Sequence, residues 1–357
     1  MTAASRRREV TVADVAREAG VAKATASRAL GGYGAVSDEA RDRVLAAAEA
    51  LGYRPNELAR SMNTGKSKTI GVVVGDIENG YFGLAMRGIS DAAKRAGYDI
   101  ILVNTSEDVE AEIDAVRLLL DKRVDGLIVA PASAYRTEHL REVHQSGHPL
   151  VLLDRRIESL PAVSVGVDIA PAARAATRAL VAEGHRRIAF VSALGTDGER
   201  YSGLPLGVSS VTDRLVGILQ GLEETGIPIS PELIRFEAHG AEKTHAVIAD
   251  LLALSEPPTA ILLSDSLVAL NVLLAFRELG IKVPRDVSVV AFDDVDWAAI
   301  TDPPMTVVSQ PIYDVGVTAA EELLRLMRGM APDATTLRLP AALVERDSIG
   351  PVAVSAQ

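Results

Sequence analysis

The sequence predicts an α/β protein in two parts: an N-terminal helix-turn-helix, and a larger core of two lobes, each a doubly wound parallel sheet. Three observations carry this prediction. A short turn that contains glycine separates two amphipathic segments near the N-terminus. Beyond residue 69, short runs of Val, Ile and Leu alternate with segments of helical periodicity. The chain of 357 residues is long enough for two or three domains.

The predicted helix-turn-helix occupies residues 10–55. Thr11 is placed to cap a first short helix, and Gly20 ends that helix. A second short helix is expected over 23–30, and Ser37 is placed to cap a third. In a DNA-binding unit of this kind the second helix enters the major groove of double-stranded DNA, so the motif suits DNA as a partner. Helical hairpins of this spacing also occur as plain structural pieces, which is the alternative interpretation.

Eight apolar runs in the core read as buried strands, because they are continuous in β-branched and other aliphatic residues. The first four runs are 69–74, 99–104, 125–131 and 149–154. The second four runs are 186–192, 233–238, 259–265 and 286–294. Helical segments between the strands predict parallel sheets with helices on both faces. Ligands bind such sheets beyond the carboxyl ends of the strands, so a cleft between the two lobes is the expected ligand site.

Charge is divided unevenly along the chain. Residues 1–68 hold 12 Lys and Arg against 8 Asp and Glu, and the remainder holds 25 against 40. The resulting net charges of +4 and −15 give the −11 of the whole chain. A basic N-terminal part attracts phosphates, while an acidic core stays away from the duplex. Residues 1–9 are expected to be a basic disordered terminus.

Several classes of protein are disfavoured by what the sequence lacks. There is no Cys, which excludes disulfides and cysteine metal sites and suits a reducing cytoplasm. The basic N-terminus has no apolar core of a signal peptide, and no apolar run reaches the roughly 18–20 residues of a membrane span. We therefore expect a cytoplasmic protein that does not contact a membrane.

An enzyme is the first alternative to a DNA-binding protein. The sequence contains no dinucleotide-binding, P-loop, nucleophile-elbow or zinc-protease motif. His144 and His148, with His139 nearby, could suggest a metal site, but no acidic cluster accompanies them. We expect solvated histidines near helix ends instead. The sequence thus predicts no catalytic residue, no metal and no cofactor.

The motifs GYRPNELARS after the third helix and VERDS near the C-terminus, together with the helix-turn-helix, resemble the lactose-repressor (LacI/GalR) family over about residues 10–348. The resemblance implies a ligand-responsive transcriptional regulator, a repressor, that binds a pseudo-palindromic operator as a homodimer. It also implies a hinge helix and linker at 56–68 and an effector-binding and dimerisation core at 69–350. A sugar-binding protein without a regulatory role is the second alternative.

The family resembles periplasmic sugar-binding proteins in its core, which implies that the chain crosses between lobes three times. The first lobe would comprise about 69–167 and 297–327, and the second about 168–296 and 328–350. Residues 351–357 form a short tail without heptads.

The candidate DNA-binding residues come from the second helix and from the hinge. Lys23, Thr25, Ser27 and Arg28 carry groups that reach phosphates and base edges. By resemblance, Met62 takes the position that wedges into the minor groove, where leucine is usual. Ala22 departs from the family's capping serine. Ala24 and Gly31 stand where the family carries polar DNA-contacting residues, so the operator sequence does not carry over. The full set is Thr11, Lys23, Ala24, Thr25, Ser27, Arg28, Asn56, Ala59, Arg60 and Met62.

The candidate effector residues follow strands or open helices in the core. Carboxylates and amides suit the paired hydroxyls of a sugar-like effector, and aromatic rings suit its apolar face. By resemblance these positions match the effector residues of the family. Ser264 stands where asparagine is common, and residues 195–211 form a longer connection than usual, which leaves the effector's identity open. The set is Asn79, Tyr81, Phe82, Asp154, Arg155, Arg214, Ser264, Asp265, Asp293 and Gln310.

Overall fold

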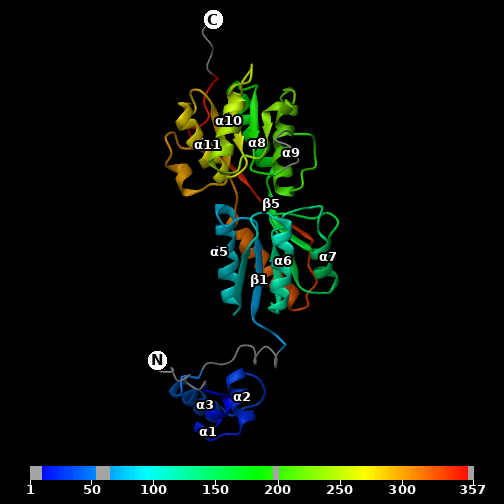
Figure 1. Ribbon diagram of the computed structural model, residues 1–357, viewed down its shortest axis with the longest axis vertical. Coiled ribbons are helices and arrows are strands. Elements are labelled where there is room, and N and C mark those ends of the chain that lie inside the picture. The colour runs from blue at the N-terminus through cyan, green and yellow to red at the C-terminus, as the bar shows by residue number, and fades with distance from the viewer. Residues whose placement is uncertain (1–9, 54–64, 196–200, 353–357) are drawn as a thin grey trace, which may run out of the picture. The chain divides into compact units, whose positions relative to one another are not determined.

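The computed structural model describes residues 10–53, 65–195 and 201–352. The chain divides between Lys68 and Thr69 into two compact units, and each is described by itself (Figure 1). The smaller unit is a headpiece of helices, and the larger unit is a core that contains two six-stranded sheets. The expected α/β class with an N-terminal helix-turn-helix is confirmed.

In its described residues the headpiece contains α1 (Val12–Glu18), α2 (Lys23–Gly31) and α3 (Asp38–Ala50). Thr11 caps α1 by accepting a hydrogen bond from the amide of Asp14, and Ser37 caps α3 in the same way from Ala40. Both predicted caps are confirmed. Gly20, with a φ of +63°, turns the chain out of the first helix. The second helix ends one residue later than predicted.

The headpiece has its own apolar core, formed where the three helices meet. Val15, Ala26 and Val44 are fully buried, one from each helix. Ala16, Ala29 and other small side chains complete this core, so the helices approach closely but enclose little apolar area. Ala22 stands at the N-cap of α2, and no side chain caps that helix.

The first sheet has the order β11-β5-β4-β3-β1-β2, and all its pairings are parallel. Its strands are β1 (Thr69–Val74), β2 (Asp99–Asn104), β3 (Gly126–Val129), β4 (Leu150–Leu153), β5 (Val163–Asp168) and β11 (Thr336–Pro340). The second sheet has the order β12-β10-β9-β8-β6-β7 and is parallel except at β12. Its strands are β6 (Ile188–Val191), β7 (Ile234–Arg235), β8 (Ala260–Leu263), β9 (Ser288–Phe292), β10 (Thr306–Ser309) and β12 (Ala342–Val344).

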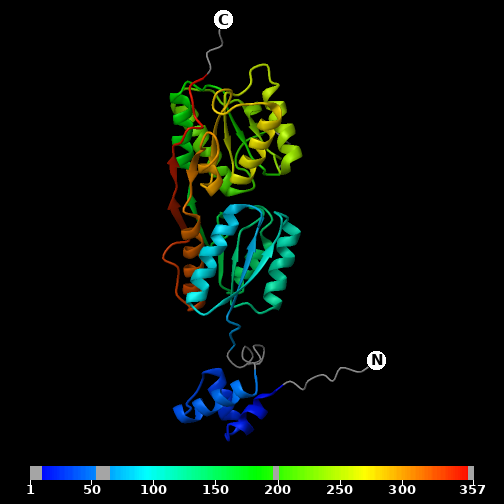
Figure 2. The same cartoon turned by 90° about the vertical axis from the view of Figure 1, so that its left-hand side faces the viewer.

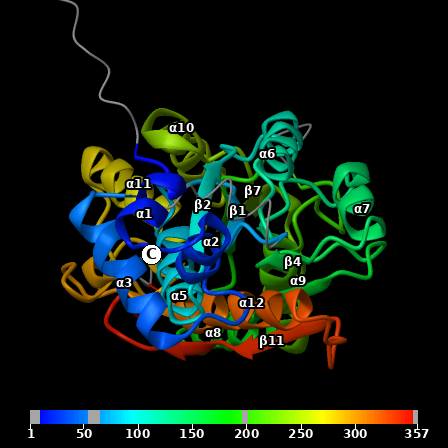
Figure 3. The same cartoon turned by 90° about the horizontal axis from the view of Figure 1, so that it is seen from below.

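Helices cover both faces of each sheet. The first lobe, built on the first sheet, carries α5 (Gly80–Arg95), α6 (Val109–Asp121), α7 (Glu138–Gln145) and α12 (Ile312–Met327). The second lobe carries α8 (Ala170–Ala182), α9 (Ser209–Glu224), α10 (Gly240–Leu252) and α11 (Ser266–Leu279), with short 3-10 turns at Pro231–Leu233 and Asp296–Ala299. Figure 3 shows α5 and α12 on one side of β1 and β4, and α6 and α7 on the other.

Alternation along the strands explains these layers. Val72 and Ile128 face the cluster that includes α5 and α12, whereas Val73 and Leu127 face the cluster that includes α6 and α7. In the first layer, α5 and α12 touch through glycine. A Cβ at Gly88 would lie 2.2 Å from the carbonyl oxygen of Tyr313, so no larger residue fits there without displacing a helix.

The lobe boundaries differ from the predicted ones in two places. β10 lies within the range expected for the first lobe, but it pairs with β9 in the second sheet. β11 lies within the range expected for the second lobe, but it pairs with β5, from Thr336 opposite Ser164 to Pro340 opposite Asp168. The chain therefore passes between the sheets after β5, after β10 and after β11. Figure 2 shows β11 and β12 following one another along the edges of the two sheets.

All eight predicted strands are present, but β5, β10, β11 and β12 were not predicted. None of the helices in the described residues combines the length and the apolar character that crossing a bilayer requires.

Candidate DNA interface and candidate effector site

Helix α2 turns one face inward and leaves the other open. Ala26 and Ala29 are buried in the headpiece core, while Lys23 and Ala24 are exposed and Thr25 is half-buried. The exposed ammonium of Lys23 lies in the first turn of the helix. An open, basic second helix is the arrangement that a major groove accepts.

Ser27 and Arg28 also lie on the outer side of α2, but each already has a partner within the headpiece. The Arg28 Nε donates to the carbonyl oxygen of Ala24 at 3.3 Å, and Ser27 Oγ lies 2.9 Å from the hydroxyl of Tyr33. Both contacts are exposed, so DNA competes with them at little cost. They hold the two side chains in defined positions before any contact with a base or phosphate.

Thr11 has a defined structural task. Its hydroxyl donates to Asp14 Oδ2 at 2.7 Å, and its amide donates to the same oxygen at 3.0 Å. The Thr11 side chain thus closes the capping box of α1. Four further candidates, Asn56, Ala59, Arg60 and Met62, lie outside the described residues.

Tyr33 is a headpiece residue that sequence reasoning missed. Its side chain is 38% exposed, and its ring lies over Gly31, where a Cβ would come within 2.3 Å of the ring. Together with the bond to Ser27 Oγ, this places an aromatic ring beside α2. The signal in the sequence was an aromatic residue in the glycine-rich segment 31–34.

In the core, two aspartates sit at equivalent points of the two lobes. Asp154 follows β4 with a φ of +63°, and Asp293 follows β9 with a φ of +75°. This left-handed conformation is uncommon for any residue but glycine, although aspartate adopts it more often than most, and positions of this kind concentrate at functional sites. Both carboxylates are buried, at 8% and 1% exposed.

Tyr81 lies where the two lobes meet. The side chain belongs to the first lobe, yet its electrostatic surroundings comprise Asp154 of its own lobe and Arg214 and Asp293 of the second lobe. Burial raises the pKa of the Tyr81 hydroxyl well above its ordinary value, and the charge of Asp154 adds to this. Asp154 and Arg214, which were predicted to face each other, therefore both lie near the Tyr81 side chain. Their own side chains do not contact each other directly in the described structure.

The second lobe contributes a compact group around Asp293. Gln310 Nε2 donates to Asp293 Oδ1 at 2.5 Å, and the Arg214 guanidinium lies 5.3 Å from the centre of the Phe292 ring. Burial raises the pKa of Asp293 to about 6, although Arg214 acts in the opposite direction. Half of the predicted effector residues, namely Tyr81, Asp154, Arg214, Asp293 and Gln310, are thus near one another.

Three buried polar atoms of this group lack hydrogen-bond partners among the described residues. They are Arg214 Nε, Asp293 Oδ2 and the Tyr81 hydroxyl, which lies near the Asp154 carboxylate but outside hydrogen-bond geometry. An unpaired buried donor or acceptor costs about 1–3 kcal/mol. A donor, an acceptor and a hydroxyl that are all unsatisfied in one place match a polyhydroxylated ligand, whose groups both donate and accept.

Other predicted effector residues serve local structure. Asn79 caps α5 by accepting from the amide of Tyr81, and Asp265 caps α11 by accepting from Leu267 and Val268. Ser264 Oγ donates to Asp265 Oδ2 at 2.7 Å. The Phe82 ring meets the Tyr81 ring edge to face at 5.5 Å between centroids. Asn79 and Asp265 thus fix the starts of α5, which carries Tyr81 and Phe82, and of α11.

Arg155 makes contacts that were not predicted. Its guanidinium forms a bidentate ion pair with Glu107, at 2.5 and 2.7 Å, and donates to the carbonyl oxygen of Pro131 at 2.8 Å. Burial alone would lower the pKa of Arg155, but the carboxylates of Glu107, Asp154 and Glu112 together outweigh burial and raise it. Arg155 is therefore held by its own lobe.

A second unpredicted contact joins the lobes. Arg156 of the first lobe forms a bidentate ion pair with Asp213 of α9, at 2.6 and 3.0 Å, and its amide donates to Ser209 Oγ. Arg338 of β11 lies 3.7 Å from the same Asp213 carboxylate. Asp213 directly precedes Arg214, so this interlobe ion pair adjoins the candidate effector site in sequence.

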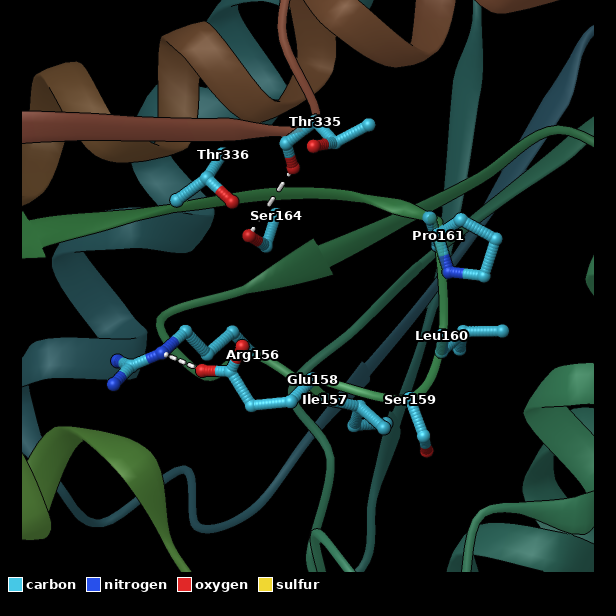
Figure 4. Close-up of a pocket in the computed structure, with 10 residues that line it drawn as sticks. Arg156, Ile157, Glu158, Ser159, Leu160, Pro161, Ser164, Thr335 and Thr336 are labelled. Carbon is cyan, nitrogen blue, oxygen red and sulfur yellow. Dashed lines mark hydrogen bonds and ion pairs between the residues drawn. The ribbon is translucent and has the colours of Figure 1, made fainter.

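A polar pocket of about 290 Å³ lies beside Arg156, as Figure 4 shows, and no predicted effector residue lines it. Within it, Ser164 Oγ donates to the carbonyl oxygen of Thr335 at 3.3 Å. The lining comes from the β4–β5 connection, β5 and the start of β11: Arg156, Ile157, Glu158, Ser159, Leu160, Pro161, Ala162, Ser164, Thr335 and Thr336.

The prediction of solvated histidines was wrong for His139. Its Nε2 lies 2.6 Å from Glu112 Oε1, and its side chain is only 10% exposed because α6 and α7 enclose the pair. His148 is partly buried, which lowers its pKa. Within the described ranges, no group of three or more His, Asp or Glu side chains is arranged to hold a metal ion.

The headpiece and the core point to a regulator that couples DNA binding to a ligand, and comparisons with known proteins agree. Residues 11–56 match the model of bacterial regulatory proteins of the lacI family, and residues 177–349 match a periplasmic binding protein-like domain. The chain is 34% identical over 338 residues to the HTH-type transcriptional regulator RegA of Clostridium saccharobutylicum, covering 95% of this chain and 98% of the relative. It is equally 34% identical over 340 residues to catabolite control protein A of Priestia megaterium, covering 95% and 99%.

Solved structures agree with the sequence relatives. A lac repressor dimer bound to operator and the anti-inducer ONPF superimposes with a TM-score of 0.81 at 29% identity, covering 96% of this chain and all of that one. A complex of the transcriptional regulator CelR with cellobiose gives a TM-score of 0.68 at 26% identity, covering 95% of this chain and all of that one. This chain belongs to the lacI family of bacterial regulatory proteins, and it is a ligand-responsive, DNA-binding transcriptional regulator.

Proposed function

We propose that this regulator is a repressor that binds a pseudo-palindromic operator as a homodimer and responds to a sugar-like effector held between its lobes. The observation that carries the proposal is the buried group around Tyr81, in which side chains of both lobes meet with unpartnered polar atoms. A ligand that satisfies Tyr81, Arg214 and Asp293 together binds both lobes at once. Its affinity therefore depends on their relative orientation.

The proposed DNA contacts are those of an open helix on a basic unit. Lys23 and Arg28 supply charge to phosphates, and Thr25 and Ser27 supply hydroxyls to base edges. Thr11 and Ala24 complete the headpiece set, and Asn56, Ala59, Arg60 and Met62 are proposed for the hinge on the family's pattern alone. Two headpieces related by a two-fold axis read two half-sites.

The proposed effector contacts are the buried charges and amides, with the two rings as an apolar wall. Asp154 and Asp293 accept from hydroxyls, Arg214 and Gln310 donate to them, and Tyr81 does both. Asn79, Phe82, Arg155, Ser264 and Asp265 complete the set as side chains that shape the site. CelR with cellobiose and an Enterococcus faecium lacI-family regulator with bound ribose give a sugar precedent among the matched structures.

The proposal assigns the chain no catalytic activity, and it places the protein in the cytoplasm because the operator is genomic DNA. A ligand screen on the full chain tests the effector. Neutral monosaccharides and disaccharides are added singly, and a binder raises the unfolding temperature by mass action. A gel-shift assay with fragments of the source genome then follows DNA retention with and without that binder.

The expected result is a fragment that is retained at moderate salt and whose retention changes when the binder is added. A chain that binds a sugar but retains no specific fragment is a solute-binding protein, and that result contradicts the proposal. A chain that retains DNA but responds to no sugar contradicts the proposed effector class.

A further inference from the structure

The Glu107 side chain lies in a space beside Gly75, which we call its seat. The residue lies between β2 and α6 with a φ of +62°, and its amide donates to the carbonyl oxygen of Gly75 at 3.0 Å. Its carboxylate occupies the space where residue 75 would carry a side chain, since a Cβ at Gly75 would lie 2.1 Å from Glu107 Oε1. Glycine directly after β1 therefore leaves room for this carboxylate.

In this position the Glu107 carboxylate forms a bidentate ion pair with the Arg155 guanidinium. Oε1 and Oε2 accept from the two terminal nitrogens of the guanidinium, and one of these nitrogens also donates to the carbonyl oxygen of Pro131. Arg155 Nε has no hydrogen-bond partner among the described residues and lies 3.7 Å from Asp154 Oδ2. Glu107 is 40% exposed and Arg155 only 11%.

The position of this pair beside Asp154 gives it a consequence for the ligand. The Arg155 guanidinium also lies 5.9 Å from the centre of the Phe82 ring. A guanidinium fork is the group that proteins use for bidentate binding of carboxylate, sulfate or phosphate. Here the Glu107 carboxylate already occupies the guanidinium of Arg155. An acidic ligand therefore cannot pair with Arg155, and the negative charge of Asp154 repels it as well.

We propose that Glu107, seated over Gly75, sets the charge selectivity of the effector site, which accepts uncharged polyhydroxylated ligands and rejects their carboxylate counterparts. The proposal rests on the proposed function only in taking the group around Tyr81 and Asp154 as the effector site. Glu107 is a positioning and selectivity residue, because it acts through Arg155.

Two variants release Arg155 by different routes. Glu107→Gln removes the negative charge with little change of shape. Gly75→Ala places a methyl group where the carboxylate lies, and the flexible end of Glu107 moves away. The matched control is Glu110→Gln, which breaks the exposed ion pair of Glu110 with Arg136 in the same lobe.

Sulfate is the first probe, because its binding does not depend on the effector's identity. The unfolding temperature of each full-length protein is measured while sodium sulfate replaces sodium chloride at constant ionic strength. We expect a saturable rise in Glu107→Gln and a smaller one in Gly75→Ala, beyond the general salt effect in wild type and Glu110→Gln. Equal responses of the unfolding temperature in wild type and Glu107→Gln would overturn the proposal. No rise in Gly75→Ala would overturn the role of Gly75 in leaving room for the Glu107 carboxylate.

Matched sugars are the second probe. Glucose and galactose are compared with glucuronate and galacturonate, which differ only by a carboxylate in place of a hydroxymethyl group. Glu107→Gln is expected to bind a uronate at least about tenfold more tightly than wild type does, since one opposing charge near the ligand is removed. A wild type that binds a uronate as tightly as its neutral partner would refute the inference. A wild type that binds no neutral sugar while Glu107→Gln gains sulfate binding would instead refute the proposed effector class.

Discussion

Asp293 occupies a position where burial raises its pKa to about 6 from the ordinary 3.8. Between about pH 4 and 6 the folded protein therefore retains a proton that the unfolded chain has released. The stability that this group contributes is complete below about pH 4 and is lost as the pH rises through about 6. At neutral pH the site holds a buried carboxylate that Gln310 and Arg214 compensate only in part.

Asp293→Asn is expected to remove this pH dependence. Going from about pH 4.5 to about pH 7.5, the variant should gain about 2 kcal/mol of unfolding free energy relative to wild type, because one pKa unit corresponds to about 1.4 kcal/mol. Urea unfolding at the two pH values, without added sugar, measures the difference. Asp294→Asn, in the neighbouring ion pair with Arg346, is the control. Parallel curves for wild type and Asp293→Asn would contradict the burial argument.

Lys23 and Arg28 are expected to carry affinity for DNA. Replacing either with alanine should weaken operator retention and reduce the slope of affinity against salt concentration by about one unit for each lost phosphate contact. Titrations by gel shift or fluorescence anisotropy at several salt concentrations give both quantities. Arg43→Ala is the matched control, since Arg43 is an exposed arginine on α3 of the same headpiece. Unchanged binding by Arg28→Ala would show that α2 is not the reading helix.

Helix α9 joins two tasks in adjacent residues: Asp213 holds the interlobe ion pair and Arg214 faces the effector group. The Arg156 and Asp213 side chains are 27% and 19% exposed, so their attraction is less screened than that of a surface pair. A double-mutant cycle of Arg156→Gln and Asp213→Asn should give a coupling free energy of about 1–2 kcal/mol in urea unfolding. The exposed pair of Arg174 with Glu224, between α8 and α9, should give about 0.5 kcal/mol or less. Similar values for both pairs would contradict a special role for Asp213.

Elements with a local signal were the ones that the sequence predicted. Thr11 and Ser37 predict the starts of α1 and α3, because a helix cap involves only residues that are close in sequence. Continuous apolar runs predict the central strands in the same local way. The missed strand β11 is half-exposed and is stabilised by pairing with β5, about 170 residues earlier in the chain. That contact leaves no trace in local periodicity, so the lobe boundaries were misplaced.

The candidate site shows the same division. Asp154 and Asp293 were predicted from their positions after strands, and the structure gathers both around Tyr81. Glu107 was missed because a glutamate in the loop before a helix has the pattern of a solvated surface charge. Its importance depends on Gly75 and Arg155, which are distant in sequence. His139 was misjudged for a similar reason, since its partner Glu112 comes from another helix.

At the scale of the whole molecule, the two units have very different cores. The headpiece buries mainly alanines and valines, whereas the core buries many leucines, isoleucines and phenylalanines. Hydrophobic stabilisation scales with buried apolar area, and small domains bury a smaller fraction of their surface. The headpiece is therefore the unit that opens more readily.

Hydrogen exchange on the full chain measures this difference. Without DNA, amides of α1, α2 and α3 should exchange at least about 100-fold faster than those of β1 and β8, which lie inside their sheets. Operator DNA should slow exchange in the headpiece, because a ligand that binds only the folded state stabilises it. Equal protection of α3 and β8 in the free protein would contradict the argument from core size.

The covalent path from the headpiece enters the core at Thr69, the first residue of β1 in the first lobe. The second lobe has no covalent route to the DNA-binding unit except the three passages after β5, β10 and β11. Three chain connections hold the two lobes together, so the motion left to them is a change of relative orientation. We therefore expect a substitution in the second lobe to affect DNA binding through a change in how the two lobes are oriented. Its effects on repression should vanish when a crosslink fixes the two lobes to each other. The chain contains no cysteine, so a pair of introduced cysteines can form that crosslink without competing thiols.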